Sequence, residues 1–299
     1  MPVSSATNSS VEEQIKKIIG NIKNLPTPPI VFEQIQKVIN DPDTSSADVA
    51  GILSEDPAMS IKVLKLTNSA FYGLSREIDS VRHAVTIIGL EAVKNLVLSA
   101  SVMSMFKADE KNREFHEDYW RHSLATAVAS KMLAKEIKAN QTFNPDPAFT
   151  SGLIHDIGKM IICGFMREEH QKIQAIVKES PNTSIREIET SILGFDHAIL
   201  GKQLALQWKL PDRMADTIGY HNRPAEENSS DNYAMLVNLG DCLSHMTFPS
   251  EKLGSARIKA SAEALSFFNL EMEKLLELKS QLAEEYTKAE TFMRIAGIN

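Results

Sequence analysis

A histidine and an aspartate stand next to each other at His155 and Asp156, inside an otherwise apolar segment. A neutral imidazole and a carboxylate are ligands that zinc, iron, manganese and nickel accept. Neighbouring residues on a helix point about 100° apart, so both side chains reach one ion only at a helix end or where another helix approaches. The pair therefore predicts a divalent-metal site whose other ligands come from other helices.

Further candidate ligands lie at intervals along the chain. His122 precedes the pair on a long predicted helix, and Asp241 follows it inside the apolar run 239–243. An acid in an apolar run is costly to bury without a partner, so a metal, a salt bridge or a helix kink would each explain Asp241. His197 and His221 lie between these positions, near predicted helix ends. The alternative for all of them is a buried hydrogen-bond network without metal.

Lys159 and Asp118 are secondary candidates. Lys159 follows Asp156 by three residues and faces much the same way on a helix, where its ammonium could contact a phosphate held by the metal. If the chain is an enzyme, Asp156 and Lys159 are its predicted catalytic residues. Asp118 shares a helix face with His122 and could be an acidic ligand or hold that histidine. The other histidines have charged or polar neighbours, which predicts surface positions for His83, His116, His170 and His245.

The elements that must position these residues are predicted to be helices. Apolar residues recur at helical spacing along nearly the whole chain, and the alternating runs typical of strands are hard to find. The sequence thus predicts an all-α multi-helix bundle. In the first third we expect helices at about 10–22, 30–39, 46–53, 59–68, 80–88 and 90–106. Beyond them we expect helices at about 115–138, 147–163, 167–179, 185–193, 196–208, 211–221 and 231–247.

The predicted helices fall into four regions. We expect an N-terminal tail and helix (1–24), an N-terminal helical lobe (25–112), a metal-binding helical core (113–248) and C-terminal helices (249–299). The charged stretch 109–114 marks the division between lobe and core. In the last region, apolar residues at helical spacing predict an amphipathic helix that packs on the body through Leu275, Leu278, Leu282 and Tyr286.

Composition and charge narrow the class of protein. The chain is 43% hydrophobic and 24% charged, which is ordinary for a soluble globular protein. Its net charge of −7 argues against a dedicated nucleic-acid binder, because binding phosphates normally needs a basic face. Two cysteines outside any CxxC pair favour a reducing compartment. Since the N-terminus lacks the pattern of a signal peptide and no apolar run approaches the roughly 18 residues of a membrane span, we expect a cytoplasmic protein without a membrane segment.

The order of the candidate ligands resembles a known signature. His122, then His155-Asp156, then Asp241 is similar to the His, His-Asp, Asp pattern of the HD superfamily of metal-dependent phosphohydrolases. Other segments are similar to the HDOD family, the HD-related output domain of bacterial signalling proteins: Leu25–Pro29, Glu55–Ala58, Val63–Ala70, Trp120–Ser123 and Leu210–Asp212. This similarity runs from about residue 25 to 220 and implies an HD-like helical core. Pro28 departs from the family's opening motif, where leucine is more frequent.

The resemblance implies two possible functions. HDOD domains are regarded as regulatory, which implies a signalling module that holds one or two divalent ions (Fe, Mn, Ni or Zn) and whose partner is a signalling protein or a small phosphorylated ligand. The wider superfamily implies the alternative, a metal-dependent phosphohydrolase acting on a nucleotide or cyclic dinucleotide.

His197 and His221 match the additional histidines with which the related HD-GYP phosphodiesterases build a second metal position. The chain nevertheless has His221-Asn222 where that relative has two histidines, and it lacks the Gly-Tyr-Pro element. No glycine-rich phosphate loop or arginine cluster accompanies the His-Asp pair, and Arg223 is an isolated candidate for a phosphate contact. We therefore expect a regulatory protein rather than an enzyme.

Overall fold

The computed structural model of the 299-residue chain describes residues 5–22, 25, 27–39, 41, 43–106, 110–136, 143–180, 182–226, 232–253 and 260–295. All regular elements in these residues are helices, which confirms the all-α prediction. The first are α1 (Ser5–Asn21), α2 (Ile30–Ile39), α3 (Ser46–Ser54), α4 (Pro57–Thr67), α5 (Val81–Ile88) and α6 (Leu90–Met105). The middle ones are α7 (Arg113–Glu136), α8 (Pro145–Ile154), α9 (Ile157–Phe165), α10 (Arg167–Glu179), α11 (Ile185–Leu193), α12 (His197–Gln207) and α13 (Asp212–Tyr220). The last are η1 (Pro224–Glu226), α14 (Tyr233–Thr247), η2 (Glu251–Leu253), α15 (Ala262–Phe267), α16 (Met272–Glu277), α17 (Lys279–Ala289) and α18 (Thr291–Ile295).

Most predicted helices are found with small differences at their ends, and α10 and α11 have the predicted bounds. Three predictions were wrong. The first helix begins at Ser5 rather than Ser10, the predicted helix 147–163 is interrupted into α8 and α9, and the single C-terminal helix is divided into α16 and α17. At the interruption between α8 and α9, the apolar pattern continues on both sides of His155 and Asp156. Neither of these two residues is a glycine or a proline, the residues that usually signal the end of a helix.

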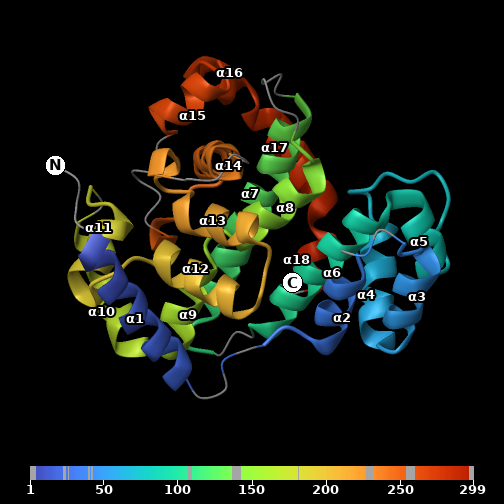
Figure 1. Cartoon of the computed structure of the whole chain (residues 1–299). Coiled ribbons are helices and arrows are strands. Elements are labelled where there is room, and N and C mark those ends of the chain that lie inside the picture. The colour runs from blue at the N-terminus through green and yellow to red at the C-terminus, as the bar shows by residue number, and fades with distance from the viewer. Residues whose placement is uncertain are drawn as a thin grey trace.

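The helices gather into two groups around α6 and α7. Helices α2 to α5 lie together on one side, whereas α8 to α14 lie on the other, as Figure 1 shows. Helix α6 packs against α2 and α4 of the first group and against α8 of the second. Helix α7 packs along α8, α14 and α17. The two long helices therefore connect the group α2 to α5 with the group α8 to α14.

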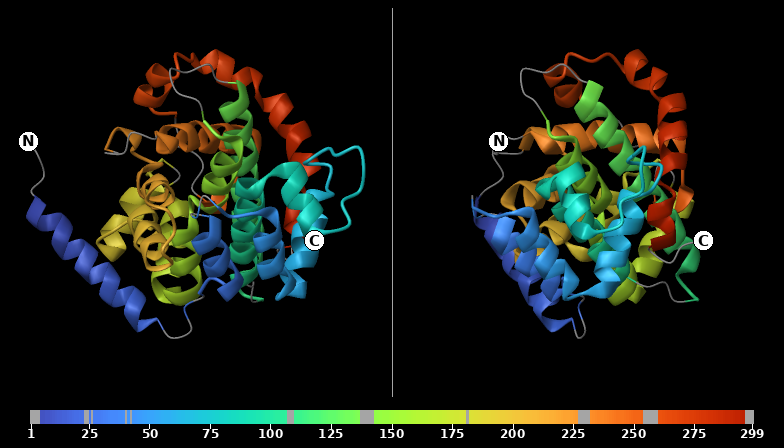
Figure 2. Two further views of the ribbon diagram at one scale, coloured as in Figure 1. Left: turned by 45° about the vertical axis from the view of Figure 1, so that its right-hand side comes forward. Right: turned by 90° about the vertical axis from the view of Figure 1, so that its right-hand side faces the viewer.

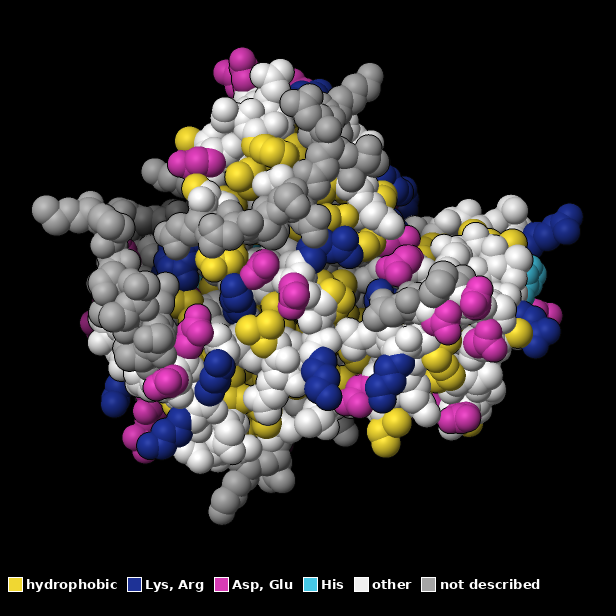
Figure 3. All heavy atoms as spheres, viewed as in Figure 1, with side chains coloured by type: hydrophobic (Ala, Val, Ile, Leu, Met, Phe, Trp, Pro, Cys, Tyr) yellow, Lys and Arg dark blue, Asp and Glu magenta, His cyan; other side chains and the backbone are white. Residues whose placement is uncertain are grey.

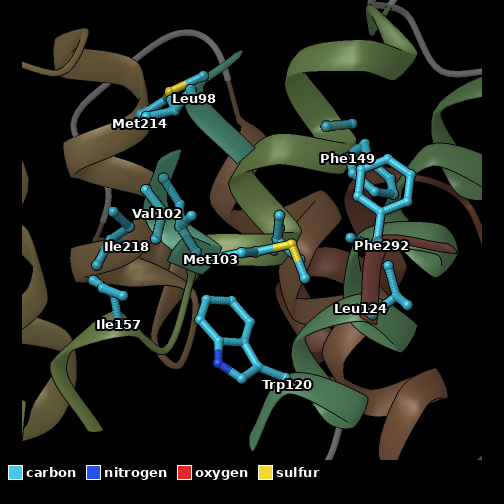
Figure 4. Packing of buried hydrophobic residues seen from close by; sticks show 14 of the residues in the cluster. Leu98, Val102, Met103, Trp120, Leu124, Phe149, Ile157, Met214, Ile218 and Phe292 are labelled. Atoms are coloured by element: carbon cyan, nitrogen blue, oxygen red, sulfur yellow. The ribbon is translucent and has the colours of Figure 1, made fainter. Parts of the chain in front are cut away.

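Buried apolar side chains fill the space between α6 and the core helices (Figure 4). Val102 and Met103 of α6 lie among side chains from three other helices, Ile157 of α9, Ile218 of α13 and Trp120 of α7. Each of these residues is almost completely buried. This packing fixes α7, α9 and α13 relative to one another, and each of them carries or borders a candidate ligand.

A sharp corner separates α5 from α6. Gly89 has φ +89°, a backbone conformation that favours glycine, and the two helices bend by 119° there. Within the described residues, no single helix is long and apolar enough to cross a membrane, and only the pair α5 and α6, taken together across this bend, meets that length and composition.

The C-terminal helices run back along the body, as both views of Figure 2 show. Helix α17 packs on α7 and α14, and α18 contacts α4, α6 and α7. The apolar positions that the sequence assigned to this interface are buried, namely Leu275, Leu278, Leu282 and Tyr286. On the face shown in Figure 3, basic and acidic side chains are interspersed.

Candidate metal centre

The His155-Asp156 pair lies at the interruption between α8 and α9. His155 keeps helical dihedrals, whereas Asp156 leaves the helix with φ −98° and ψ 14°. The change in backbone direction lets both side chains point into the same space instead of diverging around one helix. The imidazole Nδ1 of His155 lies 2.7 Å from the carbonyl oxygen of Gly152, which fixes the orientation of the ring.

Asp241 of α14 meets two histidines at one end of this space. Its Oδ1 lies 3.1 Å from Nε2 of His122 on α7 and 3.7 Å from Nε2 of His155. The two imidazole nitrogens are 3.3 Å apart. Three helical segments far apart in the sequence therefore place two nitrogens and a carboxylate oxygen around one point.

Asp156 lies between two pairs of histidines. Its Oδ1 is 3.1 Å from Nε2 of His197 and 3.4 Å from Nε2 of His221. Its Oδ2 is 3.4 Å from Nε2 of His155 and 3.7 Å from Nε2 of His122. A carboxylate whose two oxygens face different nitrogen pairs can serve one ion or bridge two.

The same four histidines turn their other ring nitrogen away from the centre. As in His155, Nδ1 of His221 lies close to a backbone carbonyl, that of Ile218 at 2.8 Å. Nδ1 of His122 lies 3.1 Å from Oγ of Ser244. A proton on Nδ1 leaves the lone pair on Nε2, the tautomer that binds a metal, and outer partners of this kind are typical of metal-binding histidines.

Glu189 of α11 is the outer partner of His197, and the sequence reasoning missed it. Its Oε2 accepts from the His197 backbone nitrogen at 2.9 Å and lies 2.6 Å from Nδ1 of the same residue. His197 is further placed by Asp196, which caps α12 by accepting from the Ile199 amide. A signal for Glu189 exists in the sequence: it lies four residues after Ile185, on the apolar face of a predicted helix, where an acid needs a partner.

Three histidines predicted to be at the surface are buried, so that prediction was wrong for His116, His170 and His245 and holds only for His83. Their polar neighbours in the sequence lie on other faces of the same helices. His116 lies 2.8 Å from the Phe106 carbonyl, and His170 packs on Phe115. His245 lies beside the candidate ligands, with Nε2 3.3 Å from Oδ1 of Asp241.

The secondary candidates have different positions. Lys159 is buried, and its Nζ lies 2.5 Å from Oδ2 of Asp156. Asp118 instead accepts from Ser250 at 3.0 Å. The guanidinium of Arg223 lies 4.0 Å from Asp196, outside the ligand cluster. Of these three residues, Lys159 alone belongs to the centre.

Burial and neighbouring charges set the protonation of the centre. Burial disfavours a charged imidazole, but Asp156 and Asp241 outweigh this and raise the pKa of His155 to about 10. Burial also opposes the charge on His197, yet Glu189 and Asp156 raise its pKa to about 9. Burial alone would raise the carboxyl pKa values of Asp156 and Asp241. The charges of His155 and Lys159 hold the pKa of Asp156 well below the ordinary value, and the contacts with the neighbouring histidines do the same for Asp241.

The residues fit a divalent metal ion. Asp156 Oδ1 and Asp241 Oδ1 are buried, and neither has a hydrogen-bond partner in the described part of the chain. Two overlapping groups have all their ligand atoms within 4.8 Å of one another, His122 with His155 and Asp241, and His155 with Asp156 and His221. Imidazole and carboxylate ligands suit zinc, iron, manganese and nickel. A cation would satisfy both carboxylate oxygens and the converging lone pairs.

The candidate ligands are closed off from solvent. All six predicted ligands, His122, His155, Asp156, His197, His221 and Asp241, are at most 2% exposed. Lys159, the candidate phosphate contact, is 4% exposed and engaged by Asp156. In this conformation the arrangement can bind ions, whereas a phosphoester would need one of the surrounding helices to move.

The structure is a bundle of helices around a buried cluster of histidines and aspartates. This is the arrangement of an HD-like helical core, which the order of the ligands in the sequence implies. The comparison with family sequences is specific: the HDOD domain matches residues 25–224, two thirds of the chain. The chain belongs to the HDOD domain family.

Individual relatives are distant. An uncharacterised protein of Treponema pallidum (strain Nichols) is 25% identical over 288 residues, which cover 95% of this chain and 54% of that protein. The chain thus spans about half the length of this curated relative.

Solved structures share the fold. An HDOD domain protein of unknown function from Geobacter sulfurreducens is 22% identical, with a TM-score of 0.73 over 95% of this chain and 98% of the other. A provisionally named signal transduction protein from Marinobacter aquaeolei VT8 is 23% identical, with a TM-score of 0.76 over 98% and 65%. A provisionally named phosphohydrolase from Shewanella amazonensis SB2B is 22% identical, with a TM-score of 0.71 over 97% and 98%.

Proposed function

We propose that the chain is a regulatory signalling protein whose helical core holds one or two divalent transition-metal ions without turning over a substrate. The observation that carries this proposal is the convergence of four histidine Nε2 atoms on two buried carboxylates that are closed to solvent. A closed ligand cluster stabilises the helices that contribute to it, and in this conformation it does not admit a phosphoester. The partner would be a signalling protein or a small phosphorylated ligand, and the Marinobacter aquaeolei relative's name supports a signalling role.

A phosphohydrolase is the second candidate. Lys159 favours it, because its ammonium lies 2.5 Å from Asp156 and could hold a phosphate oxygen beside the centre. The name of the Shewanella amazonensis relative points the same way. When bound, a divalent ion would supply an activated water and neutralise charge on the phosphate. Asp156 and Lys159 would then orient a nucleotide or cyclic dinucleotide, once a movement had opened the site.

Metal analysis of the purified protein tests the first part of the proposal. We expect about one to two transition-metal ions per chain, because the two ligand groups overlap. His155→Ala should lose most of this metal, since His155 belongs to both groups. His83→Ala, at an exposed histidine outside the cluster, is the matched control and should keep it. Wild-type protein that takes up no zinc, iron, manganese or nickel would contradict both metal-dependent functions.

Hydrolysis of a generic phosphodiester, bis(p-nitrophenyl) phosphate, separates the two functions. With added manganese or iron we expect the wild type to show no more turnover than Asp156→Ala. Turnover that is abolished in Asp156→Ala and kept in His83→Ala would instead establish the phosphohydrolase.

Metal affinity is expected to rise with pH. His155 and His197, with pKa values raised to about 10 and about 9, carry protons at pH 7 in the metal-free protein. A metal binds the neutral imidazole, so each bound ion displaces protons. The affinity should therefore increase from pH 6 to about 10 and then level off. Titration calorimetry with Zn²⁺ in two buffers of different ionisation enthalpy would count the released protons, and a pH-independent affinity would contradict the protonation described above.

A further inference from the structure

We propose that His245 is an additional metal ligand, which completes a four-ligand site together with His122, His155 and Asp241. The inference rests on the proposed metal-binding function and adds to it a residue outside the His, His-Asp, Asp pattern. It also assigns different roles to the two ends of the centre.

The ring of His245 is buried without a hydrogen-bond partner in the described part of the chain. The side chain is almost entirely buried, since the residue is 5% exposed, yet neither Nδ1 nor Nε2 has a hydrogen-bond partner among the residues that the structure describes. Buried polar groups are nearly always satisfied, so such a ring needs an explanation. A metal ion bound at Nε2 would give one of the two ring nitrogens a partner.

The ring of His245 lies beside two of the candidate ligands, Asp241 and His122. His245 follows Asp241 by four residues on α14, so both side chains project from one face of the helix. Nε2 of His245 lies 3.3 Å from Oδ1 of Asp241, an oxygen that also lacks a hydrogen-bond donor. The ring stacks on His122, with centroids 4.1 Å apart and planes inclined by 25°. Two ligands four residues apart on one helix face are a common way for a helix to hold a metal.

The two carboxylates of the centre differ in the positive charge beside them. Asp156 has the ammonium of Lys159 at 2.5 Å, whereas the ion-pair partners of Asp241 within the described ranges are all histidines. A divalent ion at the Asp241 end would supply the fixed positive charge that Lys159 supplies beside Asp156.

A ligand at His245 changes what this end can do. Three imidazoles and one carboxylate supply four protein ligands, and structural zinc sites are closed in this way, whereas catalytic zinc sites keep a position open for water. The ion held by Asp241 would therefore fasten α7, α14 and the junction of α8 with α9 to one another. Any exchangeable position would lie at the other end, near Asp156. This division supports regulation through the stability of the core rather than hydrolysis at the Asp241 end.

The test compares two histidine-to-phenylalanine variants of the full chain. His245→Phe keeps a buried ring against His122 but removes both nitrogens, so it preserves the packing and deletes only the ligand. His170→Phe is the matched control, because His170 is also buried and its ring also packs on an aromatic side chain, Phe115, away from the cluster. Thermal melting of the metal-free proteins first checks that both variants fold.

Zn²⁺ affinity is then measured by competition with a chromophoric chelator. Loss of an outer partner typically costs 10–100-fold in metal affinity, so loss of a ligand is expected to cost about 100-fold or more in His245→Phe and little in His170→Phe. In ¹⁵N-histidine spectra of the wild type, the imidazole nitrogens that shift when Zn²⁺ is added should include those of His245.

Three results would overturn the inference, and they are distinguishable. If the wild type binds Zn²⁺ and His245→Phe binds it as tightly as His170→Phe, the proposed function stands and His245 is not a ligand. If affinity falls but the His245 nitrogens do not shift with Zn²⁺, the residue acts only on the position of Asp241. If the wild type binds no Zn²⁺, the proposed function fails as well.

Discussion

Gly158→Ala is expected to lower the free energy of unfolding by about 3 kcal/mol, because α9 and α12 touch at this residue. A Cβ atom at Gly158 would lie 2.0 Å from the carbonyl oxygen of His197 and 3.0 Å from the backbone nitrogen of Gly201. Both neighbours are backbone atoms, so no side chain can rotate away. The two helices would have to separate, and His197 would move away from Asp156.

Gly164→Ala is the matched control, because this glycine lies near the end of the same helix and a Cβ there meets nothing within 4 Å. Alanine is the better helix former, so this variant should be as stable as the wild type or slightly more stable. Urea denaturation and thermal melting measure the difference, and the metal content of Gly158→Ala should fall with its stability. Equal stability of the two variants would show that the close approach of α9 to α12 does not constrain the fold.

The helices themselves could be predicted because their apolar periodicity is strong. Helix α11, for example, begins after Ser184, whose side chain caps it together with Glu187, and ends at Gly194, which has φ +83°. Both signals are local. The interruption between α8 and α9 was not predicted, since apolar residues stand on both sides of His155 and Asp156 and continue the helical pattern.

Part of the candidate site could be predicted from the order of residues along the chain. His122, His155-Asp156 and Asp241 carry a recognisable order, and the structure brings them together with His197 and His221. Their role as metal ligands stays a prediction.

His245 was assigned to the surface because its polar neighbours suggested a solvated helix. Its position four residues after Asp241 places it on the same helix face, and that spacing could have corrected the assignment. The closure of the site, in contrast, depends on tertiary packing that no local pattern encodes.

Asp156→Asn is expected to lower the free energy of unfolding of the metal-free protein by about 3–5 kcal/mol at pH 7, the cost of leaving buried charges without their partner. The substitution keeps the shape of the side chain but removes the charge that lies 2.5 Å from Nζ of Lys159. It also removes the main charge that raises the pKa of His155 to about 10. In the wild type this raised pKa stabilises the folded protein fully below about pH 6.5 and progressively less as the pH rises through 10. The variant should lack most of this dependence.

Chemical denaturation with a chelator present measures this effect without a contribution from bound metal. Asp79→Asn is the control, since the Asp79 side chain is 88% exposed and its stability effect should be negligible. The double variant Asp156→Asn with Lys159→Met should be more stable than Asp156→Asn alone, because it removes the ammonium that the first substitution leaves unpaired. Strictly additive losses would show that the two side chains are not coupled, and Lys159 would then be free to contact a ligand instead of neutralising the buried carboxylate.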